Sequence, residues 1–300
     1  MPSEGNRTLT GMTRQEYALV TITAVWGSTF LLTQHGLAVT GPWAFVGIRF
    51  GIAALVLALL FLPHLRGLTR RELTVGTLVG FLLAAGYGLQ TAGLQYIPSS
   101  TSAFLTALYV PAVPILYWLV TRRAPSADAW LGIVLAFAGL LLLTGASISG
   151  LHLGPGETMT LLSSLAVAGE IVLIGHFAGS VDARRVTVVQ LAVCSAVAFT
   201  VMPVTGEHLP TPSWTLLAIA GTLGLATAVI QVTINWAQRS VPATRATVIY
   251  AGEPVWAALL GRLAGERLTP LALAGGLLIV AAALVSELGV RHFRRLRVRA

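Results

Sequence analysis

Ten apolar runs, each about 18 to 23 residues long, constrain the fold of this chain more than any other feature. An α-helix needs about 20 consecutive apolar residues to cross the hydrocarbon core of a bilayer. Turn residues such as Pro and Gly separate most of the runs, and no connecting segment is long enough to fold alone. The sequence therefore predicts an all-α membrane protein with ten transmembrane helices, at residues 17–39, 42–62, 73–95, 99–120, 127–146, 157–178, 186–204, 213–236, 243–262 and 269–290.

Composition favours lipid as the solvent for most of the chain and excludes several functions. Of the 300 residues, 55% are hydrophobic and 10% charged, which is too much apolar surface for one soluble core. The 19 basic residues are all Arg, so the chain lacks the Lys that a P-loop or a retinal Schiff base requires. The arginines lie in short loops rather than on a base-reading face, which argues against nucleic acid. The lone Cys194 permits no internal disulfide and no cysteine metal site, and we expect no cofactor and no metal.

The distribution of arginine predicts the orientation in the membrane, because short cytoplasmic loops retain positive charge. With the N-terminus inside, 16 of the 19 arginines fall in cytoplasmic segments. The opposite side holds only Arg262 and Arg267, while Arg49 lies within the second helix. The first run follows Arg7 and Arg14 but is long enough to span and lacks a clear cleavage site, so we interpret it as an uncleaved helix. Both termini are therefore expected in the cytoplasm of a multi-pass protein of a bacterial inner membrane.

A faint internal repeat divides the chain into two halves of five helices, residues 1–147 and 148–300. A shift of 143 residues superimposes similar residues at equivalent places: Gln95 on Gln238, Pro111 on Pro254, Ser126 on Thr269 and Gly132 on Gly275. Because five is odd, the second half must enter the membrane from the opposite side, which makes the halves an inverted repeat. Such a repeat has two near-equivalent packings, one open to each side, and this is the physical basis of alternating access.

Several short motifs in this order resemble the EamA branch of the drug/metabolite transporter superfamily: Trp26-Gly27-Ser28-Thr29-Phe30, Gly47-Ile48-Arg49-Phe50, Glu253-Pro254-Val255 and Gly265-Glu266-Arg267-Leu268-Thr269. The resemblance covers nearly the whole chain. It implies a basket-like fold of two five-helix inverted repeats around a central cavity, and secondary transport of small metabolites. Members commonly export amino acids or related compounds, and others move sugars or drugs. The first-half counterpart of Glu253-Pro254 is Val110-Pro111, so a symmetrical pair of carboxylates is not expected.

Polar side chains recur at helical spacing on the helices that the resemblance places around the cavity. Such side chains are costly in lipid, so their spacing indicates which face of each helix avoids it. The alternative role for Ser, Thr, Gln and Asn is hydrogen bonding between helices. The substrate-cavity candidates are Trp26, Thr29, Thr33, Tyr87, Gln90, Thr106, Tyr109, Gln231, Asn235 and Tyr250.

Three ionisable residues, Glu253, Glu170 and Arg49, lie within the predicted helices, where a charge costs about 2.5 to 3.5 kcal/mol. Glu253 is about midway along its helix, so we consider it the first candidate for proton coupling, with Glu170 the second. An ion pair between Arg49 and Glu253 is geometrically possible and would make both residues structural. Helix kinks are expected at Pro111, Pro114 and Pro254, because proline removes a backbone donor.

These features favour a secondary active transporter that exports small amphipathic metabolites such as amino acids. A multidrug, organic-cation or sugar transporter of the same fold is the alternative. A phosphorylated substrate is disfavoured, because it would need several cationic or backbone donors. A membrane-embedded enzyme ranks low, since the spans contain no G-x-S-x-G and no H-E-x-x-H motif. A channel also ranks low, because an inverted repeat with central kinks favours a carrier.

Orientation gives the first testable prediction. A reporter fused after Ala300 should be active when it requires the cytoplasm and silent when it requires export, because the arginine count places this end inside. Paired cytoplasmic and periplasmic reporters on the same fusion site provide the measurement and its control. An exported signal would contradict the count of ten helices.

Overall fold

The computed structural model describes residues 13–122, 124, 127–144 and 153–297. This part of the chain is helical and contains no strand. The helices are α1 (Arg14–Gly36), α2 (Pro42–Leu60), α3 (Leu62–Leu65), α4 (Arg70–Gly93), α5 (Ser99–Thr106), α6 (Tyr109–Thr121), α7 (Ala127–Thr144), α8 (Pro155–Phe177), α9 (Ala183–Val204), α10 (Trp214–Ala237), α11 (Ala243–Tyr250), α12 (Glu253–Leu263) and α13 (Pro270–Arg297). The predicted boundary between the halves, at 147/148, lies outside the described residues.

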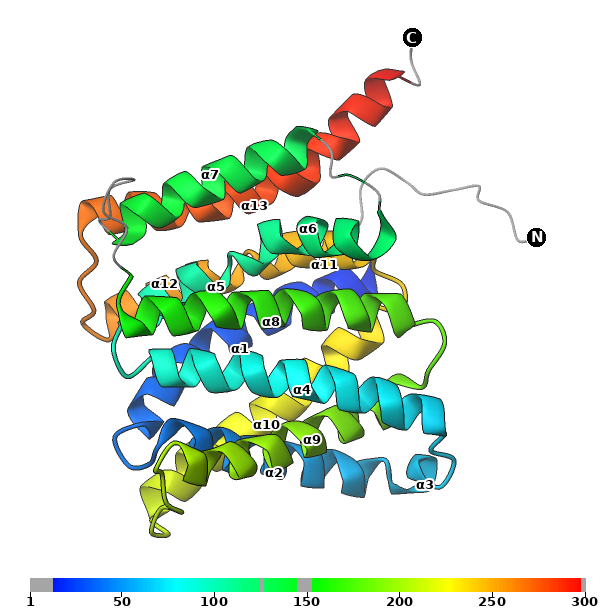
Figure 1. The fold of residues 1–300 in the computed structure, drawn as a ribbon, viewed down its shortest axis with the longest axis vertical. Helices are drawn as coiled ribbons and strands as arrows, with labels where there is room; N and C mark the ends of the chain where they lie inside the picture. The colour runs from blue at the N-terminus through cyan, green and yellow to red at the C-terminus, as the bar shows by residue number, and fades with distance from the viewer. Residues whose placement is uncertain (1–12, 123, 125–126, 145–152, 298–300) are drawn as a thin grey trace.

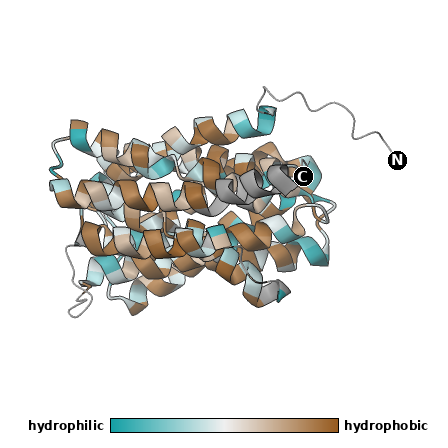
Figure 2. Cartoon of the chain, turned by 90° about the horizontal axis from the view of Figure 1, so that it is seen from above, coloured by the Kyte–Doolittle hydropathy of each residue, from teal (hydrophilic) through white to brown (hydrophobic). Residues whose placement is uncertain are grey.

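Six helical segments among the described residues are long and apolar enough to cross a membrane, which makes the chain a multi-pass membrane protein. They are Pro42–Leu60, Arg70–Gly93, Ser99–Leu119, Pro155–Phe177, Ala183–Val204 and Trp214–Ala237. Two shorter apolar segments, Trp130–Leu143 and Pro270–Val285, lie in α7 and α13. The hydrophobic residues run along the helices, and hydrophilic ones gather toward the helix ends (Figure 2).

Two expected helices are each interrupted near their middle. The segment at 99–120 divides into α5 and α6, and the segment at 243–262 divides into α11 and α12. Pro111 has no N–H to donate to the carbonyl of Ala107, and the Val110 N–H bonds that carbonyl instead, at 3.0 Å. Pro254 likewise cannot bond the carbonyl of Tyr250, where α11 ends. Pro114 lies inside α6 without ending it.

Several of the main contacts between helices occur in matched pairs (Figure 1). Helix α1 packs on α10 and on α11 and α12, while α8 packs on α4 and on α5 and α6. Helix α2 packs on α10 and α4 packs on α9. Helices α2 and α9 pack on each other, and α7 and α13 lie side by side at one edge of the bundle (Figure 1).

Carboxylates fasten helix N-termini at one end of the bundle. Glu266, between α12 and α13, accepts hydrogen bonds from the backbone N–H of Ser99 (3.0 Å) and Ser100 (3.2 Å) and from both hydroxyls. Glu207 accepts from the N–H groups of Trp43 and Ala44 at the start of α2, each at 3.0 Å. Negative charge is stabilising at a helix N-terminus, where backbone N–H groups have no partner within the helix.

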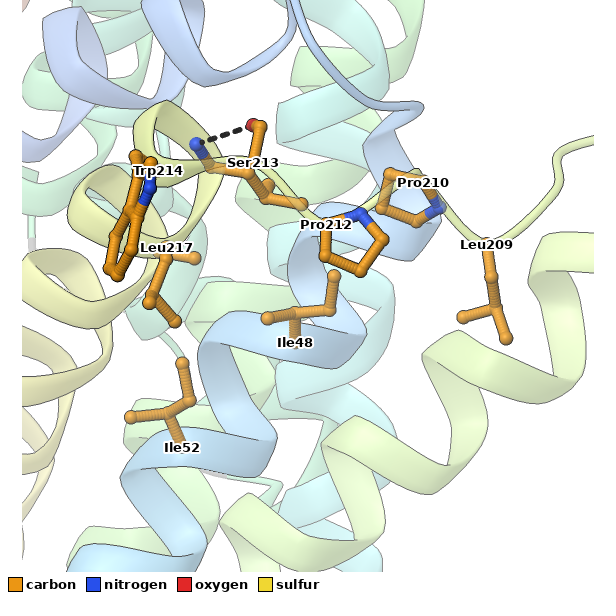
Figure 3. Close-up of a pocket in the computed structure, with 10 residues that line it drawn as sticks. Ile48, Ile52, Leu209, Pro210, Pro212, Ser213, Trp214 and Leu217 are labelled. Atoms are coloured by element: carbon orange, nitrogen blue, oxygen red, sulfur yellow. Dashed lines mark hydrogen bonds between the residues drawn. The ribbon is translucent and has the colours of Figure 1, made fainter.

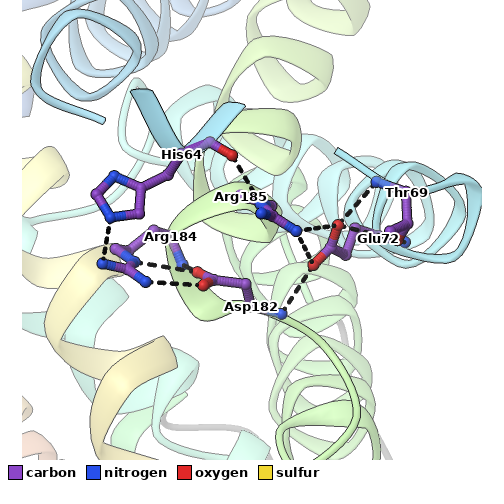
Figure 4. Close-up of polar contacts among 6 residues, drawn as sticks. All are labelled: His64, Thr69, Glu72, Asp182, Arg184 and Arg185. Atoms are coloured by element: carbon purple, nitrogen blue, oxygen red, sulfur yellow. Dashed lines mark hydrogen bonds and ion pairs between the residues drawn. The ribbon is translucent and has the colours of Figure 1, made fainter. Parts of the chain in front are cut away.

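The other end, which we call the Arg-rich end, carries an ion-pair network around α3 and the start of α9 (Figure 4). Glu72 forms a capping box with Thr69, accepts from the N–H of Asp182 at 3.1 Å and pairs with Arg185 at 3.2 Å. The Arg184 guanidinium donates to the Asp182 carboxylate and lowers the pKa of that carboxyl to about 2. The network therefore joins α4 to α9.

Glu266 gives a prediction about stability. Partial burial acts to raise the pKa of its carboxyl, but the hydrogen bonds from Ser100 and Ser99 outweigh this and hold the pKa below 4.5. The depressed pKa means that the stabilisation is present above about pH 4.5 and is lost as the pH falls further. We expect Glu266→Ala to lower the free energy of unfolding in detergent by about 1 to 3 kcal/mol at pH 7.

The measurement is the thermal unfolding midpoint of the purified protein between pH 7 and pH 3.5. The exposed neighbour Arg267 provides the control variant Arg267→Gln, which should match the wild type. Glu266→Gln should also show a smaller loss of midpoint with acid than the wild type. An unchanged midpoint in Glu266→Ala would contradict the role assigned to this carboxylate.

Candidate functional site

The ten residues expected to line a cavity all lie in the interior of the bundle. None is more than 7% exposed, although the helices that carry them present other residues to the surroundings. They come from α1 (Trp26, Thr29, Thr33), α4 (Tyr87, Gln90), α5 (Thr106), α6 (Tyr109), α10 (Gln231, Asn235) and α11 (Tyr250). The polar faces that helical spacing indicates therefore point away from lipid.

Arg49 joins three helices near the middle of the bundle. Its Nε donates to the Thr227 hydroxyl of α10 at 2.6 Å, and its Nη1 donates to the Thr33 hydroxyl of α1 at 3.2 Å. The guanidinium carbon lies 5.6 Å from the ring centroid of Phe50 and 5.3 Å from that of Tyr87. Its partners are thus neutral hydroxyls and aromatic rings. No ion pair joins Arg49 to Glu253 or to any other described residue.

A second set of polar contacts joins α9 and α10. Gln190 donates through Nε2 to Oε1 of Gln231 at 2.9 Å. Asn235 donates through Nδ2 to the Gln231 carbonyl at 2.9 Å and to Oε1 of Gln190 at 3.4 Å. Sequence reasoning did not single out Gln190, which is fully buried. The cost of an amide inside the apolar run 186–204 is the signal that would have found it.

Glu253 lies at the first position of α12, where the interrupted helix starts again inside the bundle. One carboxyl oxygen, Oε2, accepts from the Tyr109 hydroxyl at 3.4 Å, and Oε1 has no partner among the described residues. Gly27 allows α1 to approach closely here, since a Cβ at that position would lie 2.6 Å from the Glu253 carbonyl oxygen. Two of the sequence motifs, around Trp26 and around Glu253, thus meet at one helix contact.

Aromatic side chains lie close to the ionisable groups Arg49, Glu170 and Glu253. Tyr87 lies within electrostatic reach of Arg49, Glu170 and Glu253, and Tyr250 within reach of the two carboxyls. Trp26 meets Tyr250 edge to face, with the ring centroids 5.7 Å apart. The structure therefore brings together the charged and aromatic candidates from both halves of the chain.

Several buried polar atoms of this region have no hydrogen-bond partner within the described part of the chain. Buried polar groups are nearly always satisfied in folded proteins, so these atoms are candidate points of contact for a water molecule or a polar ligand. Donors and acceptors are both represented. The atoms are Trp26 Nε1, Arg49 Nη2, Ser102 Oγ, Ser163 Oγ, Gln231 Nε2, Gln238 Oε1 and Glu253 Oε1.

A separate pocket of about 480 Å³ lies between α2 and the start of α10 (Figure 3). Its walls are almost entirely apolar, with side chains such as Ile48, Ile52, Leu217 and Trp214. The Ser213 hydroxyl in its lining already accepts the Leu216 N–H at 3.1 Å. This pocket lacks groups that could orient a polar solute. No group of three or more potential metal ligands occurs among the residues described by the structure.

Comparison with known proteins places the chain among transporters rather than enzymes. The model of the EamA-like transporter family matches residues 15–145 and again residues 154–287. An uncharacterized transporter of Archaeoglobus fulgidus is 31% identical over 279 residues, which cover 92% of this chain and 86% of the relative. The uncharacterized inner membrane transporter YedA of Escherichia coli K12 is 31% identical over 288 residues, covering 90% and 89%.

A solved crystal structure with 18% identity shows the same fold. Its TM-score is 0.67, and the match covers 94% of this chain and 99% of that one. The helical bundle, its membrane spans and the two family matches agree with one another. The chain is a multi-pass protein of the cell membrane, and it belongs to the EamA-like transporter family.

Proposed function

We propose that this protein is a secondary active transporter that exports small amphipathic metabolites, such as amino acids, across the inner membrane by alternating access. The observation that carries the proposal is the set of buried donors and acceptors without partners among the described residues, which come from helices of both halves. A carrier needs such groups to replace the water that its substrate leaves behind.

The ten spans are proposed to form two inverted repeats of five helices, with both termini in the cytoplasm. The paired helix contacts and the two successive matches to one family model support this arrangement. The four spans beyond the six apolar segments would be formed by α1, α7, α11 with α12, and α13. Residues 1–147 and 148–300 would then be the two repeats, and the small-molecule substrate would bind between them.

The chemistry of the site favours a substrate with both polar and apolar parts. Trp26, Tyr87 and Tyr250 offer apolar ring faces, while the unpartnered atoms offer hydrogen bonds of both kinds. Organic cations are the second candidate class, because two buried carboxyls, Glu170 and Glu253, stand against one arginine. Aromatic rings beside carboxyls also suit cations.

Proton coupling is proposed at Glu253. Its carboxyl has one oxygen without a partner and no cation within ion-pair distance among the described residues, so a proton would be the simplest compensation for its charge. It also begins α12, directly before Pro254, so a change in its charge acts on the end of a broken helix. Glu170, on α8, is the second candidate.

A cysteine experiment tests whether the face of α10 that carries Gln231 and Asn235 lines a water-filled pathway. In a Cys194→Ala background, Gln231→Cys and Asn235→Cys should react with a polar methanethiosulfonate reagent during turnover, because alternating access opens the interior to water. Val229→Cys is the matched control, since Val229 lies on the same helix and is 57% exposed on its lipid-facing side. It should react only with a lipid-soluble maleimide. Labelling of Gln231→Cys and Asn235→Cys by the maleimide alone would contradict a wet cavity.

A transport experiment tests the coupling site. In liposomes, Glu253→Gln should abolish accumulation driven by a pH gradient and leave substrate exchange intact, because exchange requires no net proton release. Arg267→Gln, at an exposed position in the loop between α12 and α13, is the control and should retain both activities. Full pH-driven transport by Glu253→Gln would exclude this residue as the coupling site. Loss of both activities in a folded variant would assign Glu253 to binding or structure.

A further inference from the structure

We propose that Arg49 is the binding site for a carboxylate group of the transported substrate. This inference rests on the proposed function and narrows it to compounds that carry a carboxylate, either zwitterions or monoanions. It assigns a specificity role to a residue that sequence reasoning treated mainly as structural. Three independent observations support it: the unused donors of the guanidinium, its missing counter-charge and its position between the halves.

The guanidinium uses only part of its hydrogen-bonding capacity. Arg carries five N–H donors in a planar fork, and two of its nitrogens, Nε and Nη1, donate to Thr227 and Thr33. The third nitrogen, Nη2, is buried and has no partner within the described chain. The bonds to the two threonines fix the plane of the guanidinium and leave Nη2 to receive a ligand oxygen. A carboxylate matches the fork because two parallel N–H···O bonds can form to it.

The charge of Arg49 is also uncompensated. The residue is 2% exposed, and the ion pairs that the described residues form lie at the Arg-rich end. Its immediate contacts are hydroxyls and the rings of Phe50 and Tyr87, which offset only part of the cost of burying a cation. An anion that binds beside Nη2 would supply the missing charge. Binding of the anion would therefore offset the free-energy cost of the buried, unpaired guanidinium in the ligand-free protein.

The number of cationic groups indicates which anion fits. A phosphate dianion calls for several cationic or backbone donors, and among the described residues around the candidate site Arg49 is the one cationic side chain. A single planar carboxylate needs no more than this.

The position of Arg49 connects binding to the conformational change. Thr33 lies on α1 and Thr227 on α10, so the guanidinium contacts one helix from each half of the chain besides its own α2. A substrate held there would touch groups of both halves at once. A ligand shifts a conformational equilibrium only through such differential contacts.

The test compares ligands that differ only at the carboxylate. Purified protein in liposomes is assayed for saturable uptake of L-phenylalanine and L-leucine, with empty liposomes subtracted. Unlabelled competitors are each amino acid, its primary amide and its decarboxylated amine. We expect the amide and the amine to compete at least tenfold less well than the amino acid, because they lack the charged partner of Arg49.

Variants then distinguish carboxylate recognition by Arg49 from a purely structural role of this residue. In Arg49→Gln the affinity for the amino acid should fall by about 10- to 100-fold, while that for the amine should change little, so the preference disappears. If Arg49 had only a structural role, Arg49→Gln would lower the affinities for the amino acid, the amide and the amine equally. Thr33→Val is the control, since it removes a neutral anchor and keeps the charge, so the preference should remain. Arg49→Lys should keep part of the preference but lose affinity, since lysine lacks the fork.

The outcomes distinguish the inference from the proposed function. If the wild type binds the amide or amine as well as the amino acid, the inference is wrong even if every variant fails to fold. If the protein transports sugars or cationic drugs saturably but no compound with a carboxylate, the inference about Arg49 is wrong, while the proposed transporter function stands. Absence of saturable transport for amino acids, sugars and cationic drugs alike would instead overturn the proposed function. Thermal stabilisation in detergent by L-leucine but not by its amide would support the inference independently of flux.

Discussion

The need to satisfy backbone N–H and C=O groups in a medium that cannot hydrogen-bond governs this structure. A continuous helix meets that need by itself, and every departure from it has to be compensated by protein. Where the chain breaks between Thr106 and Tyr109, local bonds such as Val110 N–H to Ala107 take over the freed carbonyl. Where helices begin at the bundle ends, side chains from other helices or loops bond the free N–H groups, as Glu266 does at Ser99. The few irregular positions are consequently buried or at the ends.

The same constraint explains how the chain uses its acidic residues. Of 11 acids, Glu266, Glu207 and Glu72 hold the start of a helix that is distant in sequence. Each of these carboxylates replaces water with donors that the helix itself leaves unused. Glu170 and Glu253 have no such role, because they lie in the interior rather than at a bundle end. The two groups of acids therefore differ in what their environment supplies: one accepts hydrogen bonds from helix N-termini, and the other lies among interior side chains, with Glu253 Oε1 unpartnered within the described chain.

The features of the fold and of the candidate site that depend on a single helix could be predicted from the sequence. Those that depend on which helices are neighbours could not. The spacing of Gln231 and Asn235 indicated one buried face of α10, on which Thr227 also lies, because residues four apart lie on the same side of a helix. The partners of that face, Arg49 and Gln190, could not be predicted, since they come from helices 178 and 41 residues away. The position of the helix breaks was approximate for a similar reason: proline removes a donor, but tertiary packing decides where the chain turns.

The contact between α7 and α13 restricts which residues can occupy its closest point. Gly139 and Gly275 face each other so closely that a Cβ at Gly139 would lie 2.8 Å from the Gly275 carbonyl oxygen. Side chains still interlock beside this close approach, since Ile279 of α13 packs against Gly139 and shares a core cluster with Leu140 and Leu143 of α7. These helices lie at one edge of the bundle (Figure 1). A larger side chain at either glycine would push the two backbones apart, so space rather than polarity restricts these two positions to the smallest residue.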